Sequence, residues 1–115
     1  ALKNLKLIGD LGVAYTTLSK DNLKKYKYKK GDTEGFVNYG LRIEGIGVSV
    51  IFIENSEENI IKISFRSKGK IDVNKFAKKY FNGGGHKNAS GGFSNDSMIE
   101  TENKFVFSIR EFLNL

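Results

Sequence analysis

Two apolar segments separated by a short polar turn constrain the fold of this chain more than any other feature of its sequence. Residues 47–53 (GVSVIFI) form a nearly continuous apolar run, which is typical of a strand buried on both faces. Residues 60–66 (IIKISFR) place Ile61, Ile63 and Phe65 on one side at the two-residue period of a strand. Since residues 55–59 between them are polar, the pair predicts an antiparallel hairpin at the centre of a sheet.

The rest of the sequence predicts further strands and helices around this hairpin. Residues 5–8 and 13–18 are rich in strand formers and flank a glycine-containing turn, and another short strand is expected near Gly92–Phe93. Helices are expected over residues 20–26 after Ser19 as N-cap, from Asp32 or Thr33 to about Ile43, from the cap Asp72 to Tyr80, and from about Ser97 to Leu113. The fold class is therefore α/β (α+β): a single domain with a mixed, largely antiparallel central β-sheet of about five strands and flanking helices.

Composition limits the classes of function. The chain of 115 residues has no cysteine, which excludes a disulfide scaffold and cysteine-based zinc sites and fits a cytoplasmic protein. No apolar run approaches the roughly 18–20 residues of a membrane span, so we expect no membrane partner. The net charge of +6 favours anionic partners. The lysine-rich run 24–30 is consistent with a nucleic-acid stripe that has interleaved aromatics or with a solvated helix end and loop.

Residues 83–92 (GGGHKNASGG) are the strongest indication of a binding site. They contain five glycines and the only histidine of the sequence, His86. Consecutive glycines let main-chain N–H groups approach an anion closely, and a short helix starting near His86 would add the positive end of its dipole. The alternative is a flexible turn between a helix and a strand. The segment matches neither a Walker loop nor a Rossmann fingerprint, because the required spacing and flanking residues are missing.

Phosphate contact is the role that suits His86 best. One histidine without a carboxylate cluster does not make a hydrolytic metal site, and no nucleophile lies at a recognisable spacing for acid–base catalysis. Arg66 is the second candidate, because it ends a predicted strand, is followed by Ser67, Lys68 and a glycine, and can hold phosphate with its two-pronged guanidinium. An ordinary basic surface loop is the alternative for this segment.

Taken together, residues 63–69, 72–77 and 81–91 resemble the C-terminal DHH-associated domain of the DHH phosphoesterase family. The similarity is strongest to its oligoribonuclease branch of NrnA-like nanoRNases, which includes phosphatases of adenosine bisphosphate (PAP), and residues 31–38 and 48–54 agree with it. The resemblance implies that an N-terminal domain with an Asp-His-His motif binds two manganese ions, whereas the C-terminal domain holds the nucleotide. It assigns substrate binding to Arg66, Ser67, Lys68, Gly83, Gly84, Gly85, His86, Asn88 and Ser90.

The sequence departs from the family in one respect, since it contains no Asp-His-His segment. We therefore expect residues 1–115 to be a DHH-associated substrate-binding domain with no catalytic residue, no metal ligand and no bound cofactor of its own, and to be inactive in isolation. Mn²⁺ is expected on the N-terminal DHH domain of the parent chain. The expected partners are that domain and a short RNA or nucleotide substrate, and a homodimer is possible. Two alternatives are a non-catalytic RNA-binding module, as in the related domain of alanyl-tRNA synthetases, and the substrate domain of a cyclic-dinucleotide phosphodiesterase.

Overall fold

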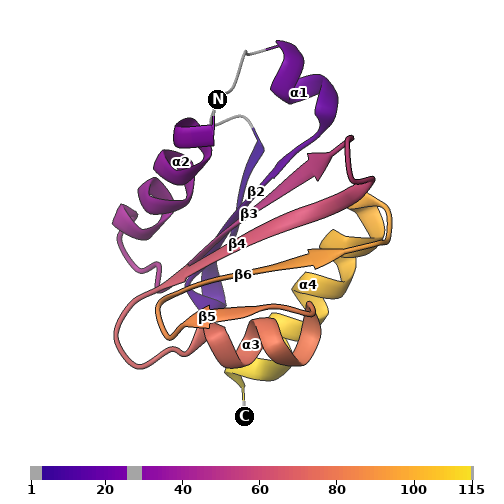
Figure 1. Ribbon diagram of the computed structural model, residues 1–115. Coiled ribbons are helices and arrows are strands. Elements are labelled where there is room, and N and C mark those ends of the chain that lie inside the picture. Colours follow the sequence, from indigo (N-terminus) through magenta and orange to yellow (C-terminus); the bar gives the residue numbers. More distant parts are fainter. Residues whose placement is uncertain (1–3, 26–29, 115) are drawn as a thin grey trace.

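The computed structural model describes residues 4–25 and 30–114, which form one six-stranded sheet with helices on both faces (Figure 1). The strands run in the order β1-β2-β3-β4-β6-β5 across the sheet. Their bounds are β1 Leu5–Ile8, β2 Val13–Leu18, β3 Val48–Asn55, β4 Ile60–Ser67, β5 Gly84–His86 and β6 Ala89–Ser94. The predicted mixed α+β domain is confirmed, with one strand more than the five expected.

The hairpin predicted from residues 47–66 lies at the centre of the sheet. β3 and β4 pair antiparallel from Val48 opposite Ser67 to Asn55 opposite Ile60. β1 and β2 form the second predicted hairpin, whose turn contains a short 3₁₀ helix and Gly12 in the left-handed conformation. β2 runs parallel to β3, since the chain between these two strands crosses over through helices.

One local prediction was wrong: no helix starts near His86. Gly84–His86 instead forms β5, which pairs with β6 so that Gly84 lies opposite Gly91 and His86 opposite Ala89. Gly84 and Gly85 have φ angles of 156° and 151°, in a region that residues with a Cβ rarely adopt. The glycines thus allow a tight hairpin at the edge of the sheet and add the sixth strand.

The helices follow the sequence signals with one shift. α1 (Lys20–Lys25) begins after Ser19, whose hydroxyl accepts from the Asn22 N–H, and α3 (Val73–Tyr80) and α4 (Met98–Leu113) begin after the capping residues Asp72 and Ser97. α2 (Lys30–Arg42) starts earlier than expected, so that Asp32 and Thr33 lie inside the helix and do not cap it. Residues 26–29, and with them the end predicted for α1 and most of the lysine-rich run, lie outside the described residues.

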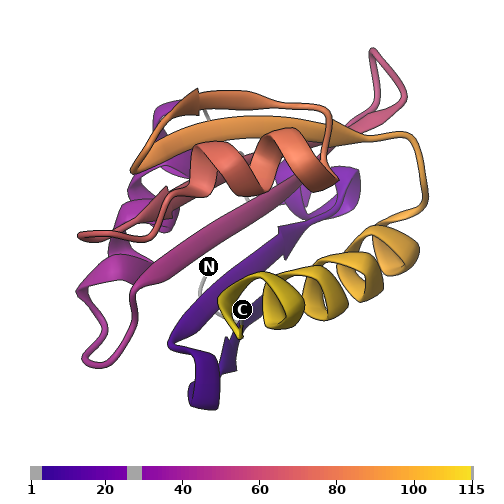
Figure 2. The same cartoon turned by 90° about the horizontal axis from the view of Figure 1, so that it is seen from below.

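The two faces of the sheet are covered by different helices (Figures 1 and 2). α3 and α4 cover one face and enclose the main core, in which Phe52, Phe65, Phe76 and Phe105 are fully buried. α2 covers β2 and β3 on the other face with a smaller core of Leu18, Val37 and Ile51. At Gly40 this helix approaches the sheet so closely that a Cβ would overlap the Ser49 side chain. Among the described residues, no helix is both long and apolar enough to cross a bilayer.

Candidate functional site

The alternation of side chains along β4 separates the core from a second, more open surface. Ile61, Ile63 and Phe65 are buried against α3 and α4, whereas Ser64 and Arg66 point to the face on which α2 lies. Strand pairing sets Ser64 beside Gly91 and Arg66 beside Ala89 of β6, and these lie beside Gly84 and His86 of β5. We call this surface, made of Ser64, Arg66, His86, Ala89 and Gly91, the open shelf.

Arg66 and His86 lie in one row across the open shelf. Ala89 is the direct register partner of Arg66 on β4 and of His86 on β5. Two strand spacings therefore separate the Cα atoms of Arg66 and His86, which is about 10 Å. The residue between them has a side chain of one methyl group, so the row consists of a cationic group and an imidazole on either side of a low floor.

The Arg66 guanidinium is already bonded within the protein. Its Nη2 donates to both carboxylate oxygens of Glu34 on α2, at 2.8 and 3.0 Å, and its Nη1 donates to the Phe65 carbonyl at 2.9 Å. The Arg66 side chain is 18% exposed and that of Glu34 is 57% exposed. The guanidinium is thus held in one orientation by a carboxylate that stands mostly in solvent.

The other two candidate donors stand in solvent. His86 and Lys68 are both exposed, His86 at the end of β5 and Lys68 directly after β4. The backbone N–H of Lys68 donates to the Gly47 carbonyl, which fixes the chain at this point while the side chain remains accessible. Both residues can therefore reach an anion at the shelf without breaking a structural contact.

The triple glycine serves packing more than it serves an anion cradle. The Gly83 N–H donates to the Ala77 carbonyl and the Gly85 N–H donates to Asn74 Oδ1 at 2.8 Å, so two of the three N–H groups are engaged inside the protein. A Cβ at Gly83 would overlap the Gly91 carbonyl oxygen. The motif thus brings β5, β6 and α3 together at distances that only glycine permits.

Three further predicted site residues are tied into the same framework. The Ser67 hydroxyl donates to the Ile71 carbonyl at 2.7 Å, and the buried Ser90 hydroxyl donates to the Val73 carbonyl at 2.9 Å. Asn88, in the β5–β6 turn, donates to Ser67 Oγ at 2.9 Å. These bonds link the β5–β6 hairpin to the start of α3, and so they hold in place the strands that carry Arg66 and His86.

Positive charge is concentrated in one segment of the sequence. The segment from Arg66 to Phe93 holds seven of the nineteen Lys and Arg residues but one of the thirteen Asp and Glu residues, so it carries a charge equal to the chain's net +6. This segment comprises the end of β4, α3, β5 and most of β6. Since α3 covers the face opposite the shelf, this excess belongs to the β5–β6 edge of the sheet as a whole, where it favours anions.

The shelf does not fit a metal site. In residues 4–25 and 30–114, no three His, Cys, Asp or Glu side chains lie close enough to hold a metal ion. Arg66 is a cationic donor and not a metal ligand, and the shelf residues include one imidazole and no carboxylate. The donors that the shelf offers, a guanidinium and an imidazole, suit an anion.

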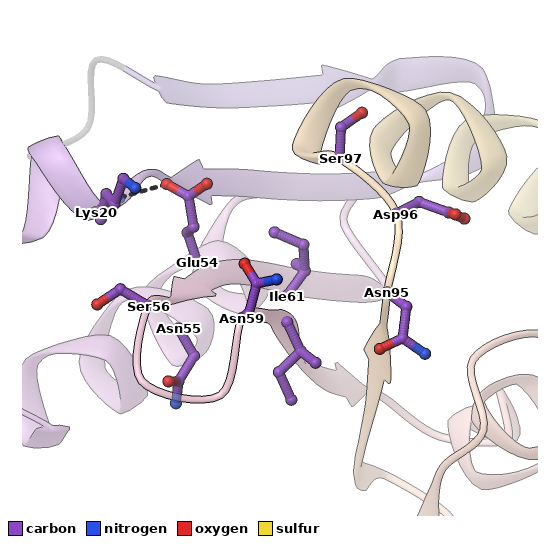
Figure 3. Close-up of a pocket in the computed structure, with 10 residues that line it drawn as sticks. Lys20, Glu54, Asn55, Ser56, Asn59, Ile61, Asn95, Asp96 and Ser97 are labelled. Carbon is purple, nitrogen blue, oxygen red and sulfur yellow. Dashed lines mark hydrogen bonds between the residues drawn. The ribbon is translucent and has the colours of Figure 1, made fainter.

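A polar pocket of about 280 Å³ lies elsewhere, at the opposite end of β4 from Arg66 (Figure 3). Its lining includes Glu54, Asn55 and Ser97, whose polar atoms serve the local structure. Glu54 accepts from the Lys20 N–H, Asn55 closes the β3–β4 turn by accepting from the Glu58 N–H, and Ser97 caps α4. The pocket is thus a junction of turns and helix starts, separate from the shelf.

Glu34 is the residue that sequence reasoning missed. It is 32 positions from Arg66 in the sequence, and no spacing rule links a residue in the first turns of a helix to the end of a distant strand. The parallel crossover between β2 and β3 is what places α2 over this face of the sheet. Its carboxylate is therefore visible as a site group only once the topology is known.

Comparison with known proteins identifies the family of this chain. The model of the DHHA1 domain family matches residues 10–114. Over 84 residues the chain is 38% identical to the bifunctional oligoribonuclease and PAP phosphatase NrnA of Bacillus subtilis. The aligned segment covers 73% of this chain but 26% of that protein. The chain therefore spans about a quarter of the length of this curated relative.

Solved structures show the same fold. An exopolyphosphatase-related protein from Bacteroides fragilis superposes with a TM-score of 0.91 at 41% identity, covering 98% of this chain and 33% of that one. The pGpG-specific phosphodiesterase PggH of Vibrio superposes with a TM-score of 0.64 at 13% identity over 95% of this chain and 35% of that one, which shows a shared fold. The resemblance seen in the sequence is thereby confirmed, and the chain belongs to the DHHA1 domain family.

Proposed function

We propose that the open shelf binds the phosphate and sugar of a nucleotide, and that the chain is the substrate-binding part of a phosphoesterase acting on short oligoribonucleotides or PAP-like nucleotides. The single observation that carries this proposal is the row of Arg66, Ala89 and His86 across three paired strands. In this reading the metal-dependent chemistry, with Mn²⁺, belongs to an N-terminal DHH domain of the parent chain.

The dimensions of the row suit a phosphate group held from two sides. The Cα atoms of Arg66 and His86 are about 10 Å apart, which leaves room for a phosphate between the two side chains. An arginine binds phosphate oxygens through parallel N–H donors, and an imidazole adds one further donor from the opposite side. Ala89 and Gly91 form a floor low enough for a nucleotide to lie flat on the strands.

The predicted site residues divide by role in this proposal. Arg66, His86 and Lys68 contact the substrate directly, since their side chains reach the shelf or the solvent beside it. Gly91 allows a ligand to approach the strands closely, whereas the space at Gly84 faces Asn74 and Lys78 of α3. Ser67, Asn88 and Ser90 act by bracing the hairpin, because their polar atoms already bond to the backbone or to one another.

Chemical-shift titration of the chain with the dinucleotide ApA tests the proposal, with PAP and pGpG as alternative probes. We expect perturbations at residues 64–68 and 84–91, and at least about tenfold weaker binding after Arg66→Ala or His86→Ala, as expected for loss of a charge-assisted hydrogen bond. Arg110→Ala is the matched control, because Arg110 also pairs with a carboxylate, Asp10, but lies on α4 against the opposite face. Perturbations confined to other surfaces would refute the proposal.

The alternative of a general RNA-binding module makes a different prediction about α1. Reversing the charges of Lys24 and Lys25 would abolish binding of a longer RNA under that alternative, and would barely change ApA binding under ours. We further expect no manganese-dependent hydrolysis by the isolated chain; robust turnover by the pure chain would contradict the division of labour proposed here.

A further inference from the structure

Glu34 forms an ion pair with Arg66, the arginine on which the proposed nucleotide site depends. Its two carboxylate oxygens accept from Arg66 Nη2 at 2.8 and 3.0 Å. We propose that Glu34 is a specificity-determining residue that makes the shelf favour phosphodiesters, which carry one negative charge, over terminal phosphate monoesters, which carry nearly two. This inference rests on the proposed function, because it requires that Arg66 receive the phosphate. Of the two substrate classes proposed above, it favours short oligoribonucleotides over PAP-like nucleotides, whose phosphates are monoesters.

The position of Glu34 is fixed by the packing of α2. Val37, one turn further along the helix, is buried in the small core with Leu18 and Ile51. At Gly40 the helix lies in close contact with Ser49, the register partner of Arg66 on β3. The packing therefore fixes the backbone of α2, and with it the point from which the Glu34 side chain reaches Arg66.

The pair leaves Arg66 able to bind a second anion. Glu34 is mostly exposed, and ion pairs with this much solvent contact contribute little to stability, so rearranging the pair costs little. Arginine has five N–H donors, and the contacts with Glu34 and the Phe65 carbonyl leave Nε unused among them. A phosphate can thus share the guanidinium with Glu34.

The charge of that phosphate then decides how well it is tolerated. A phosphate monoester carries about −1.5 to −2 at pH 7, whereas a diester carries one negative charge. Because Glu34 neutralises the charge of Arg66, each additional negative charge on the ligand meets the carboxylate without full compensation. The repulsion falls mainly on the monoester.

Two probes that differ in one charge isolate this effect. Adenosine 5′-monophosphate and its phosphate methyl ester share the nucleoside and differ by the ionisable oxygen. In Glu34→Gln we expect the affinity for adenosine 5′-monophosphate to rise about three- to tenfold more than the affinity for the methyl ester, as one charge a few ångströms away in a wet site implies. Dissociation constants come from chemical-shift titrations at low, fixed salt.

Glu57→Gln is the matched control, since it removes the same charge from the turn at the other end of β4 and should leave the ratio of the two affinities unchanged. An equal rise for both probes in Glu34→Gln would show simple competition for Arg66 and would overturn the inference. A fall for both would show that Glu34 only orients Arg66, which would also overturn it.

Failure of the proposed function gives a different result. If Arg66→Ala leaves the affinity for both probes unchanged, the proposed nucleotide site at the shelf is refuted, whatever the effect of Glu34→Gln. If Arg66→Ala weakens binding of both probes while Glu34→Gln leaves their ratio as in the unmodified chain, the site stands and the specificity role of Glu34 is refuted.

Discussion

β4 and β6 contribute to two very different surfaces, because the side chains of successive residues point to opposite faces of the sheet. Towards α3 and α4, β4 contributes Ile61, Ile63 and Phe65 to a core of closely packed aromatic rings. Towards the open shelf, the alternate residues are Ser64 and Arg66, and their β6 partners are Gly91 and Ala89. One face is thus tightly packed and the other is accessible to a ligand. The comparison predicts that substitutions on the core face change the unfolding free energy, whereas substitutions on the shelf change ligand binding.

The largest expected effect is the loss of stability after Phe76→Ala on the core side. Phe76 is fully buried, and its ring lies 5.5 Å from that of Phe65 and 5.9 Å from that of Phe105. Deleting a buried phenyl ring costs about 3–5 kcal/mol of unfolding free energy. Urea unfolding followed by circular dichroism measures this loss. Phe107→Ala is the control: Phe107 is 72% exposed, and we expect a change within about 0.5 kcal/mol.

The next largest effect is expected at Gly83, which packs directly against the backbone of β6. In Gly83→Ala the new methyl group must displace the backbone at Gly91, so we expect a loss of about 2–3 kcal/mol, typical of overpacking. Gly9→Ala is the matched control, because a Cβ there has no neighbour within 4 Å. Thermal unfolding of both variants tests this, and equal stabilities would mean that the hairpin tolerates the extra volume.

Ala89→Leu should affect the shelf without affecting the core. The larger side chain would stand between Arg66 and His86 and fill the floor. We expect binding of ApA to weaken at least about tenfold while the unfolding free energy changes by less than about 1 kcal/mol, as at other partly exposed positions. Ala89→Ser keeps the space open and should retain binding. Unchanged affinity in the leucine variant would place the ligand elsewhere.

The smallest effect is a titration on the core side. Burial, together with the hydrogen bond to Glu102, raises the pKa of Tyr15 to about 12. The unfolded chain loses this proton near pH 10, so folding stability should fall as the pH rises from about 10 to 12. Glu102→Gln should lower the Tyr15 pKa. The ultraviolet absorbance of tyrosinate, read as the difference from Tyr15→Phe, measures this pKa. An unshifted titration would contradict the part-buried hydrogen bond between Tyr15 and Glu102.

The core side could be predicted from sequence, because its signals are local. The two-residue period of residues 60–66, the continuous apolar run before it and the cap at Asp72 each fix an element from neighbouring residues alone. The same is true of the arginine at the end of β4, which the sequence marked as a candidate.

The geometry of the shelf could not be predicted in the same way, because it depends on strand register. Three glycines carry no periodic pattern, and so β5 was expected as a loop leading into a helix. Only the pairing of β4 with β6 and of β6 with β5 sets His86 in the row of Arg66. The contact of Glu34 with Arg66 could not be predicted either, since the crossover between the parallel strands β2 and β3 decides where α2 lies.

That single parallel pair also has a consequence for the order in which the chain folds. β3 and β4 are joined by a short turn, so their contacts close early, whereas β2 and β3 can pair only after the connection from Ser19 to Gly47 has been closed. We therefore expect Arg66 to take its place in the hairpin before α2 brings Glu34 to it. Substitutions in the β3–β4 hairpin should therefore slow refolding, and substitutions in β2 should mainly hasten unfolding.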